Sequence, residues 1–263
     1  MKKRNGNKKI NLPIRPIITF AAALLIFVLG AAYIWSLASS SEYFRVKYVL
    51  CKDGQLSELD YLKGRSIFDV DLRTEAQRIL AYYPGSKQVR LLRSLPDRLF
   101  VDFVMRKPIA LLRLSKYYIV DSEGVLYTTV SQAGDYDLPV ITGLESKITS
   151  PRPGTRCDIR EFRFALDMIK EANKGKIFKV YQVKRIDVKE ATDVTLFVNI
   201  PTGSQSAEVP LGFLEVKIGE GGSREKMAML AGLILASKSD LPNIKYMDLR
   251  FKEPVIKLKE KEK

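Results

Sequence analysis

The chain has 263 residues, 46% of them hydrophobic, and its 44 basic and 30 acidic side chains give a formal charge of +14. This composition allows one or two folded domains and excludes a disordered chain. The chain has no histidine and only two cysteines, Cys51 and Cys157. The commonest general base and the usual zinc ligands are therefore missing, so we expect no enzyme activity, no metal and no cofactor.

The positive charge is concentrated at the N-terminus. Residues 1–15 contain six basic side chains and no acidic one, and the rest of the chain carries 38 basic against 30 acidic side chains. That remaining excess is spread evenly, without the stripe of basic and aromatic residues that a nucleic-acid-binding surface needs. We therefore expect no nucleic acid partner.

An uncharged, mostly apolar run occupies residues 17–37. A helix of this length reaches roughly 30 Å at about 1.5 Å per residue, which matches the hydrocarbon core of a membrane. Tyr33 and Trp35 lie near the end of the run, and such aromatic side chains favour the headgroup layer. We predict a single transmembrane helix over residues 17–38.

The basic residues before this run predict the orientation of the chain. By the positive-inside rule, residues 1–16 form a basic cytoplasmic tail, and the chain from residue 42 onward lies outside the cytoplasmic membrane. The small residues at positions 38–40 leave a cleaved signal peptide as the alternative, although the apolar run is longer than the core of a usual signal peptide. Both interpretations export the rest of the chain.

The first exported segment combines two helical stretches with three strands. Residues 44–50 alternate, which predicts a strand that buries Phe44, Val46, Tyr48 and Leu50 on one face. The other predicted elements are a short helical piece over 57–62, a helix over 72–83 capped by Asp71, and strands around 89–91 and over 99–106. The predicted order is strand, helix, helix, strand, strand.

This order, directly after a membrane anchor, resembles the POTRA domain, a small module that binds polypeptides. The segments IFDVDL (67–72) and LPDRLFVDFVMRKPIAL (95–111) are similar to the form of this domain found in the FtsQ/DivIB family of bacterial cell division proteins. The resemblance implies a POTRA domain over residues 42–108.

The segment after Pro108 is rich in predicted strands. Two strands within residues 117–127 surround a turn that contains Gly124, which predicts a hairpin. Asp158 and Glu161 form a capping-box pattern, which predicts a helix from residue 159 to about 172. Further strands are predicted over 109–114, 181–188, 194–200, 214–218 and 244–256, and a second helix over 223–237.

Three more segments resemble the FtsQ/DivIB family: YIVDSEGVLY (118–127), LPVITG (138–143) and IKYMDLRFKEPVI (244–256). The family often has tyrosine where this chain has Phe251. The resemblance implies an α+β fold with one N-terminal transmembrane helix, a POTRA domain (β-α-α-β-β), and a larger β-rich domain with two or more helices over residues 109–258. A charged tail follows at 259–263.

The resemblance also implies a function without catalysis. Members of this family are scaffolds at the division septum, which link early cell division proteins to the septal peptidoglycan synthesis complex through protein contacts. The implied partners are division proteins of the FtsB/DivIC and FtsL type, and the POTRA face over residues 69–80 is a weaker candidate for recruiting others. A POTRA-containing envelope assembly or export factor is the alternative function, and a membrane-anchored peptidoglycan enzyme is a further one.

The implied partner site is the edge of the last strand, where a partner chain can add to unpaired backbone groups. In this role Arg250 would pair with an acid of the partner, and Phe251 would fill a pocket. The alternative is that Phe251 and Val255 pack in the core. The residues assigned to the site are Arg250, Phe251, Lys252, Glu253, Pro254 and Val255.

Several other patterns have simple structural explanations. The glycines at 219–222 precede a predicted helix but lack the order of a phosphate-binding loop, so a strand-to-helix turn explains them. Asp69 and Asp71 are interpreted as a turn residue and a helix cap, and the acids at 135 and 137 as a solvated loop. The two cysteines, in an oxidising compartment, form either a disulfide or two separate buried thiols.

Overall fold

The computed structural model describes residues 14–259 except 53, 56, 191, 202–211 and 220. The predicted basic tail and charged tail therefore lie almost wholly outside the described residues. The chain divides into two compact units. Unit 1 contains the chain up to residue 79 and residues 89–103, and unit 2 contains residues 80–88 and the chain from residue 104 onward.

The N-terminal helix α1 (Ile14–Ser40) is the one helix among the described residues that could cross a membrane. Its segment Ile18–Ser40 has a mean hydropathy of 2.2 and contains no charged residue. Large apolar side chains along it are exposed, including Phe20 and Phe27 at 72% and 73%. An apolar surface of this size requires lipid or another apolar partner. The position of α1 agrees with the transmembrane helix predicted over 17–38.

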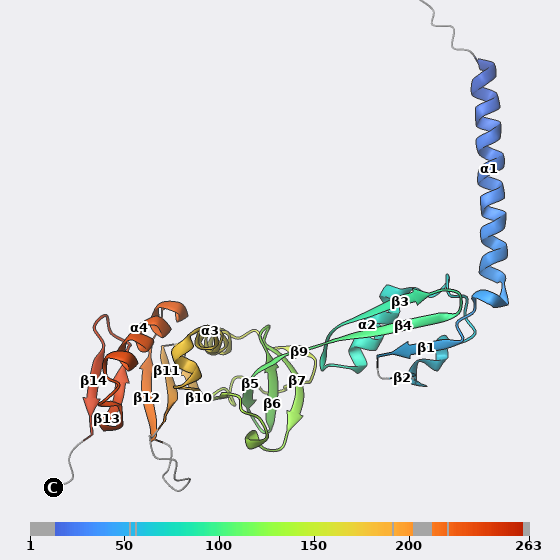
Figure 1. The fold of residues 1–263 in the computed structure, drawn as a ribbon. Helices are drawn as coiled ribbons and strands as arrows, with labels where there is room; N and C mark the ends of the chain where they lie inside the picture. Colours follow the sequence, from blue (N-terminus) through green and yellow to red (C-terminus); the bar gives the residue numbers. More distant parts are fainter. Residues whose placement is uncertain are drawn as a thin grey trace, which may run out of the picture. The chain divides into compact units, whose positions relative to one another are not determined.

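Unit 1 is built around a four-stranded sheet with the order β2-β1-β4-β3, in which β1 runs parallel to β4 (Figure 1). The predicted order of elements is present, with one additional short strand after the first. Val49, Ile67, Ile79 and Leu99 are at most 1% exposed and form part of its core. The elements are β1 (Tyr48–Cys51), β2 (Gly54–Gln55), η2 (Ser57–Leu62), α2 (Leu72–Tyr82), β3 (Ser86–Ser94) and β4 (Arg98–Met105).

Helix α2 begins as predicted, because Asp71 caps it. The Asp71 carboxylate accepts hydrogen bonds from the backbone N–H groups of Arg73 at 3.0 Å and Thr74 at 3.4 Å, and from the Thr74 hydroxyl at 2.6 Å. The hydroxyl bond and these backbone bonds hold the pKa of Asp71 below its ordinary value. The interpretation of Asp71 as a cap is confirmed.

The predicted face of the first strand is wrong. The strand begins at Tyr48 instead of residue 44, and the buried residues are Val46 and Val49, while Tyr48 is 43% exposed. The backbone N–H groups of Lys47 and Tyr48 both donate to the carbonyl of Asp97, at 2.8 and 3.3 Å. Because two successive N–H groups share one acceptor, one extra residue is inserted before β1, as in a β-bulge. The side chains after it therefore point to the opposite faces from those predicted.

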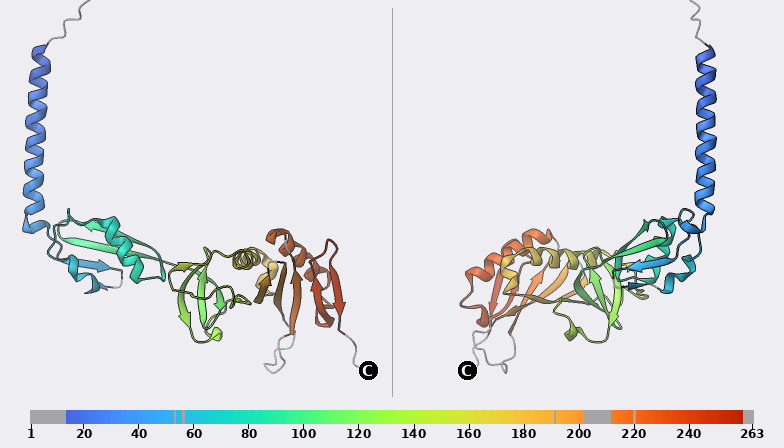
Figure 2. Two further views of the ribbon diagram at one scale, coloured as in Figure 1. Left: turned by 180° about the vertical axis from the view of Figure 1, so that it is seen from behind. Right: turned by 45° about the vertical axis from the view of Figure 1, so that its right-hand side comes forward.

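Unit 2 contains a ten-stranded sheet with the order β14-β13-β12-β11-β10-β8-β5-β6-β7-β9 (Figures 1 and 2). Its helices are α3 (Arg160–Lys174) and α4 (Ser223–Ala236), whose buried side chains share one core with the sheet. The strands are β5 (Pro108–Arg113), β6 (Tyr117–Asp121), β7 (Val125–Val130), β8 (Val140–Thr142), β9 (Thr155–Arg156), β10 (Val183–Glu190), β11 (Asp193–Ile200), β12 (Gly212–Ile218), β13 (Ile244–Asp248) and β14 (Val255–Leu258).

The capping box predicted for α3 is wrong. Ile159 occupies the cap position without a side-chain hydrogen bond, and the first helical bond runs from the N–H of Arg163 to its carbonyl. The helix therefore starts one residue later than a box formed by Asp158 and Glu161 requires. Asp158 instead pairs with Arg163 at 3.1 Å, and Glu161 with Lys147 at 2.6 Å.

The face of the unit 2 sheet opposite the main core is covered unevenly. A small second core of Leu111, Ile119 and Tyr127 covers it at β5, β6 and β7. Across β10 to β14 a row of paired side chains crosses the same sheet, with Arg185 3.8 Å from the Phe197 ring centroid. The register places the other members of this row, Glu215, Tyr246 and Lys257, on successive strands. Such cross-strand pairs stabilise a sheet face on which the described residues form no second layer.

Candidate protein-interaction site at the sheet edge

Strand β14 forms one edge of the unit 2 sheet. It pairs antiparallel with β13, and within the described part of the chain no strand pairs with its other side. An edge strand leaves backbone N–H and C=O groups with which a strand of another chain can pair. The end of β14 is held in place because the N–H of Lys259 donates to the carbonyl of Asn243 at 2.8 Å.

Three of the four side chains of β14 are apolar, and the fourth is Lys257. Val255, Ile256 and Leu258 are 49%, 38% and 59% exposed. Ile256 lies opposite the fully buried Met247 and therefore faces the core side, whereas Val255 lies opposite Asp248 on the other side. Edge strands of soluble proteins are usually protected by charge, proline or a covering segment. β14 contains one such charge, Lys257, and follows Pro254, but its three exposed apolar side chains favour a partner that covers this edge.

An ion pair fixes the turn between β13 and β14. Asp248 is 5% exposed, and its carboxylate accepts hydrogen bonds from the backbone N–H of Arg250 at 3.0 Å and from Arg250 Nη2 at 2.7 Å. These bonds from Arg250 hold the pKa of Asp248 below its ordinary value. Arg250 Nη1 also lies 3.8 Å from Asp193 Oδ1. The Arg250 guanidinium is thus paired with two acids of its own chain.

The structure corrects the placement of the predicted site residues. Residues 250–254 lie in the turn between β13 and β14, and only Val255 belongs to the edge strand. The cause is Asp248, whose side chain binds the N–H of Arg250 and so competes with continuation of the ladder. The predicted residues remain neighbours, but five of them are turn residues and only one lies on the edge strand.

The exposure of the turn excludes one alternative. Phe251 is 59% exposed and Val255 is 49% exposed, so the interpretation that they pack in the core is wrong. The Arg250 guanidinium lies 6.0 Å from the centroid of the Phe251 ring, which is long for a strong cation–π contact. Lys252, Glu253 and Pro254 are also exposed.

Sequence reasoning missed Ile256 and Leu258 as members of the exposed edge. A pattern for a strand is present in the sequence, because the four residues 256–259 (IKLK) alternate apolar and basic side chains. This pattern is too short to distinguish a strand from a charged tail. The burial of Asp248 had no signal in the sequence.

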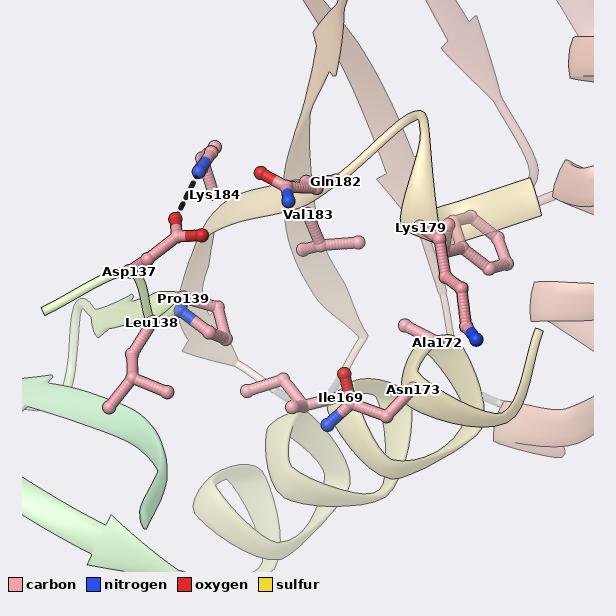
Figure 3. A pocket seen from close by; sticks show the side chains of 11 residues that line it. Asp137, Leu138, Pro139, Ile169, Ala172, Asn173, Lys179, Gln182, Val183 and Lys184 are labelled. Carbon is pink, nitrogen blue, oxygen red and sulfur yellow. Dashed lines mark hydrogen bonds and ion pairs between the residues drawn. The ribbon is translucent and has the colours of Figure 1, made fainter. Parts of the chain in front are cut away.

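A cavity of about 390 Å³ lies elsewhere in unit 2, beside α3 (Figure 3). Asp137 and Lys184 face each other at its rim and form an ion pair of 2.5 Å, while Leu138, Pro139 and Ile169 supply apolar walls. The two opposite charges at the rim therefore balance each other. Among the described residues no group of three or more potential ligands could hold a metal ion.

The remaining candidate residues take no part in the edge. The described residues 219, 221 and 222 lie between β12 and α4, as predicted, and residue 220 lies outside the described residues. Asp137 is 74% exposed in its side chain, as expected for a solvated loop, and the side chain of Asp135 lies outside the described part. Cys51 and Cys157 are free thiols and are only half-buried. Burial raises the pKa of Cys157.

Comparison with known proteins places the chain among cell division proteins. The family described as "Cell division protein FtsQ/DivIB, C-terminal" matches residues 110–250. The "Cell division protein FtsQ" of Geotalea daltonii is 26% identical over 249 residues, which cover 89% of this chain and 83% of that protein. The protein of the same name from Syntrophotalea carbinolica is 24% identical over 242 residues, with 89% and 81% covered. That of Geobacter sp. (strain M21) is 27% identical over 194 residues, with 73% and 65% covered.

Proposed function

The chain belongs to the FtsQ/DivIB family of cell division proteins, and on that premise we propose that it is a non-enzymatic scaffold of the division machinery. It is a single-pass membrane protein, since α1 is the one helix among the described residues that is long and apolar enough to cross a membrane. In the proposed role it links early division proteins to the septal peptidoglycan synthesis complex through protein contacts, and it acts at the division septum.

The proposed topology follows from the charge distribution. The basic N-terminal tail is cytoplasmic, α1 crosses the membrane, and the chain from residue 42 onward lies on its outer side. The order and pairing of the unit 1 strands support the assignment of residues 42–108 as a POTRA domain. Residues 109–258 then form the second domain, with the charged residues 259–263 after it.

The proposed partner site is the β14 edge together with the preceding turn. It comprises Arg250, Phe251, Lys252, Glu253, Pro254 and Val255, extended to Leu258. The proposed partner is a coiled-coil division protein of the FtsB/DivIC type, with an FtsL-type protein bound through it or beside it. The family match ends at residue 250, so support for β14 comes from its own geometry.

One observation carries this proposal: among the described residues no strand pairs with the outer side of β14, and apolar side chains are exposed on both of its faces. A strand from the partner gains backbone hydrogen bonds and removes Val255, Ile256 and Leu258 from water at the same time. Within this arrangement Arg250 has a supporting role, because its guanidinium already pairs with Asp248. Phe251 is the turn residue free to enter a partner pocket.

The test is co-purification of the full-length chain in detergent with its FtsB/DivIC-type partner. Ile256→Asp places a charge where the partner strand must bury an apolar group, and we expect binding to weaken by about tenfold or more, equivalent to roughly 1.4 kcal/mol. Arg250→Glu is a poorer probe, because it also breaks the internal pair with Asp248.

The matched control is Val180→Asp, which changes a valine that is 56% exposed in another part of unit 2. This variant should bind the partner like the wild type. In dividing cells the tagged wild type and Ile256→Asp should both reach the septum, but only the wild type should retain the partner. Equal loss of binding in both variants would remove the edge as the site, and a uniform envelope signal for the wild type would favour the export alternative.

A further inference from the structure

Helix α1 is followed directly by a short, hydrogen-bonded helix of unit 1. The helix ends at Ser40, and Ser41 caps the short 3-10 helix η1 (Glu42–Phe44) by accepting a hydrogen bond from the N–H of Tyr43 at 3.2 Å. The N–H of Ser41 in turn donates to the carbonyl of Ala38 at 3.3 Å. The part of unit 1 that follows α1 therefore begins at the depth at which the membrane-spanning helix ends.

An aromatic side chain of unit 1 contacts α1 near its C-terminal end. The Phe68 ring lies 5.1 Å from the Trp35 ring of α1 and 5.3 Å from the Phe44 ring of η1. Trp35 precedes the end of the helix by five residues, or about 7 Å. A headgroup layer is itself about 5–8 Å thick. If α1 spans the bilayer, Phe68 and Phe44 lie within the headgroup layer and not above it.

The segment that carries Phe68 is tied to strand β3. Arg93 Nε donates to the carbonyl of Ile67 at 2.7 Å, and Arg93 Nη2 donates to the carbonyl of Val70 at 2.8 Å. The turn between β3 and β4 is tied to the chain after η1, because the Asp97 carbonyl accepts the N–H of Lys47 at 2.8 Å. Both views in Figure 2 show this turn beside the C-terminal end of α1. These segments form one end of unit 1, which we name the proximal end.

The proximal end exposes the side chains that membrane interfaces favour. Tyr43 is 62% exposed and Leu95, in the β3–β4 turn, is 58% exposed. The side chains of Lys47 and Arg98 are 55% and 56% exposed, and Asp97 lies 3.8 and 3.6 Å from them, so one positive charge remains over the group. Apolar and aromatic tips flanked by basic side chains are typical of surfaces that lie in the headgroup layer.

We propose that the proximal end of unit 1 is a lipid-contacting surface on the membrane that α1 crosses. Leu95 and Tyr43 enter the boundary between acyl chains and headgroups, and Arg98 and Lys47 bind the phosphate groups of phospholipids. Phospholipid is the occupant because α1 fixes the depth of Trp35, and Trp35 contacts Phe68. The inference rests on α1 as a membrane span and is independent of the division partners.

The test uses the full-length chain in nanodiscs whose phosphatidylcholine carries a nitroxide quencher on the headgroup. Trp35 is the only tryptophan, so Trp35→Phe gives a silent background into which Leu95→Trp introduces a reporter. The matched control is Leu92→Trp, a leucine of β3 that is 55% exposed and lies about 10 Å further along the strand. We expect at least twofold stronger quenching of the Leu95→Trp reporter.

A second variant tests the headgroup contact itself. Lys47→Glu combined with Arg98→Glu should weaken the quenching of the Leu95→Trp reporter at least twofold and raise its quenching by aqueous acrylamide. Unit 1 must remain folded, which the circular dichroism of the variant checks. Equal quenching of the Leu95→Trp and Leu92→Trp reporters overturns the proposal, as does quenching that the two charge reversals leave unchanged.

Discussion

Two aspartate–arginine pairs lie near opposite ends of the unit 2 sheet, and they resemble each other in their local design. Asp121 is the last residue of β6, and Asp248 is the last residue of β13. Each carboxylate accepts a hydrogen bond from the backbone N–H two residues later, at 2.9 Å from Glu123 and at 3.0 Å from Arg250. Both aspartates therefore end a strand and shape the following turn.

The arginines differ in where they come from and how far they are buried. Arg106 lies fifteen residues before Asp121, has a side-chain exposure of 12%, and also donates from Nε to the carbonyl of Pro84 at 3.3 Å. Arg250 follows Asp248 by two residues and has a side-chain exposure of 37%. The Asp121 pair thus joins separate segments of the chain, whereas Arg250 pairs mainly with Asp248 of its own turn and only at 3.8 Å with Asp193 of β11. A turn ordered in this local way can stay accessible beside an open edge.

The largest expected effect comes from breaking the buried pair. Arg106→Met leaves the Asp121 carboxylate, 3% exposed, without its cation, and we expect unit 2 to lose about 3–5 kcal/mol of unfolding free energy. Urea unfolding of the full chain in detergent, followed by circular dichroism, measures this loss. Lys87→Met is the control, because Lys87 pairs with Glu123 nearby at 52% exposure and should contribute little. Equal losses of unfolding free energy in the two variants would contradict the explanation that burial of the Arg106–Asp121 pair causes the larger loss.

The turn after Asp121 gives a second difference between the two ends. Gly124 has a φ of +81°, and a Cβ there would lie 3.2 Å from the carbonyl oxygen of Cys157. No residue from Leu249 to Pro254 has a positive φ. Gly124→Ala should cost about 1–3 kcal/mol through strain and crowding.

Gly64→Ala separates the two contributions. Gly64 has the same φ of +81°, but no atom lies within 4 Å of a Cβ built there. The cost of Gly64→Ala should therefore be the backbone strain alone, about 1–2 kcal/mol. If Gly124→Ala loses no more unfolding free energy than Gly64→Ala, then the backbone near Cys157 moves enough to remove the close contact with the new Cβ.

Breaking the exposed pair should have a smaller effect. Arg250→Met should lower the unfolding free energy by at most roughly a third of the Arg106→Met loss. The two carboxylates are similarly buried, but the Arg250 side chain is 37% exposed and that of Arg106 only 12%, so water screens the Arg250 pair more strongly. The same urea experiment measures it. Partner binding should also fall less than for Ile256→Asp, since the edge of β14 is still formed. A loss as large as that of Arg106→Met would show that the turn supports the whole sheet.

The sequence predicted the regular elements well where one local pattern determines them. Alternation predicted a strand over 194–200 and the structure has Asp193–Ile200, and Asp71 caps α2 as expected. The predictions failed where a contact with a distant residue or with a side chain determines the local backbone structure. The bulge before β1 depends on the Asp97 carbonyl, fifty residues further along the chain. The family resemblance pointed to the correct end of the sheet, but the turn at 250–254 depends on the Asp248 side chain, which no periodic pattern reveals.

The smallest expected effect is the response of the Asp248 pair to pH. The hydrogen bonds from Arg250 lower the pKa of Asp248 in the folded state, whereas in the unfolded chain an aspartate titrates near about 3.9. As the pH falls, the unfolded state binds this proton first, so the stability gained from the pair is present above about pH 4 and is lost as the pH falls through the folded pKa. The difference in unfolding free energy between the wild type and Asp248→Asn should therefore shrink between pH 6 and pH 3. In an Arg250→Met background the same comparison should depend less on pH, because the main cause of the lowered pKa is gone. A wild-type difference that stays constant over this range would mean that Arg250 orders the turn without stabilising the charged form of Asp248.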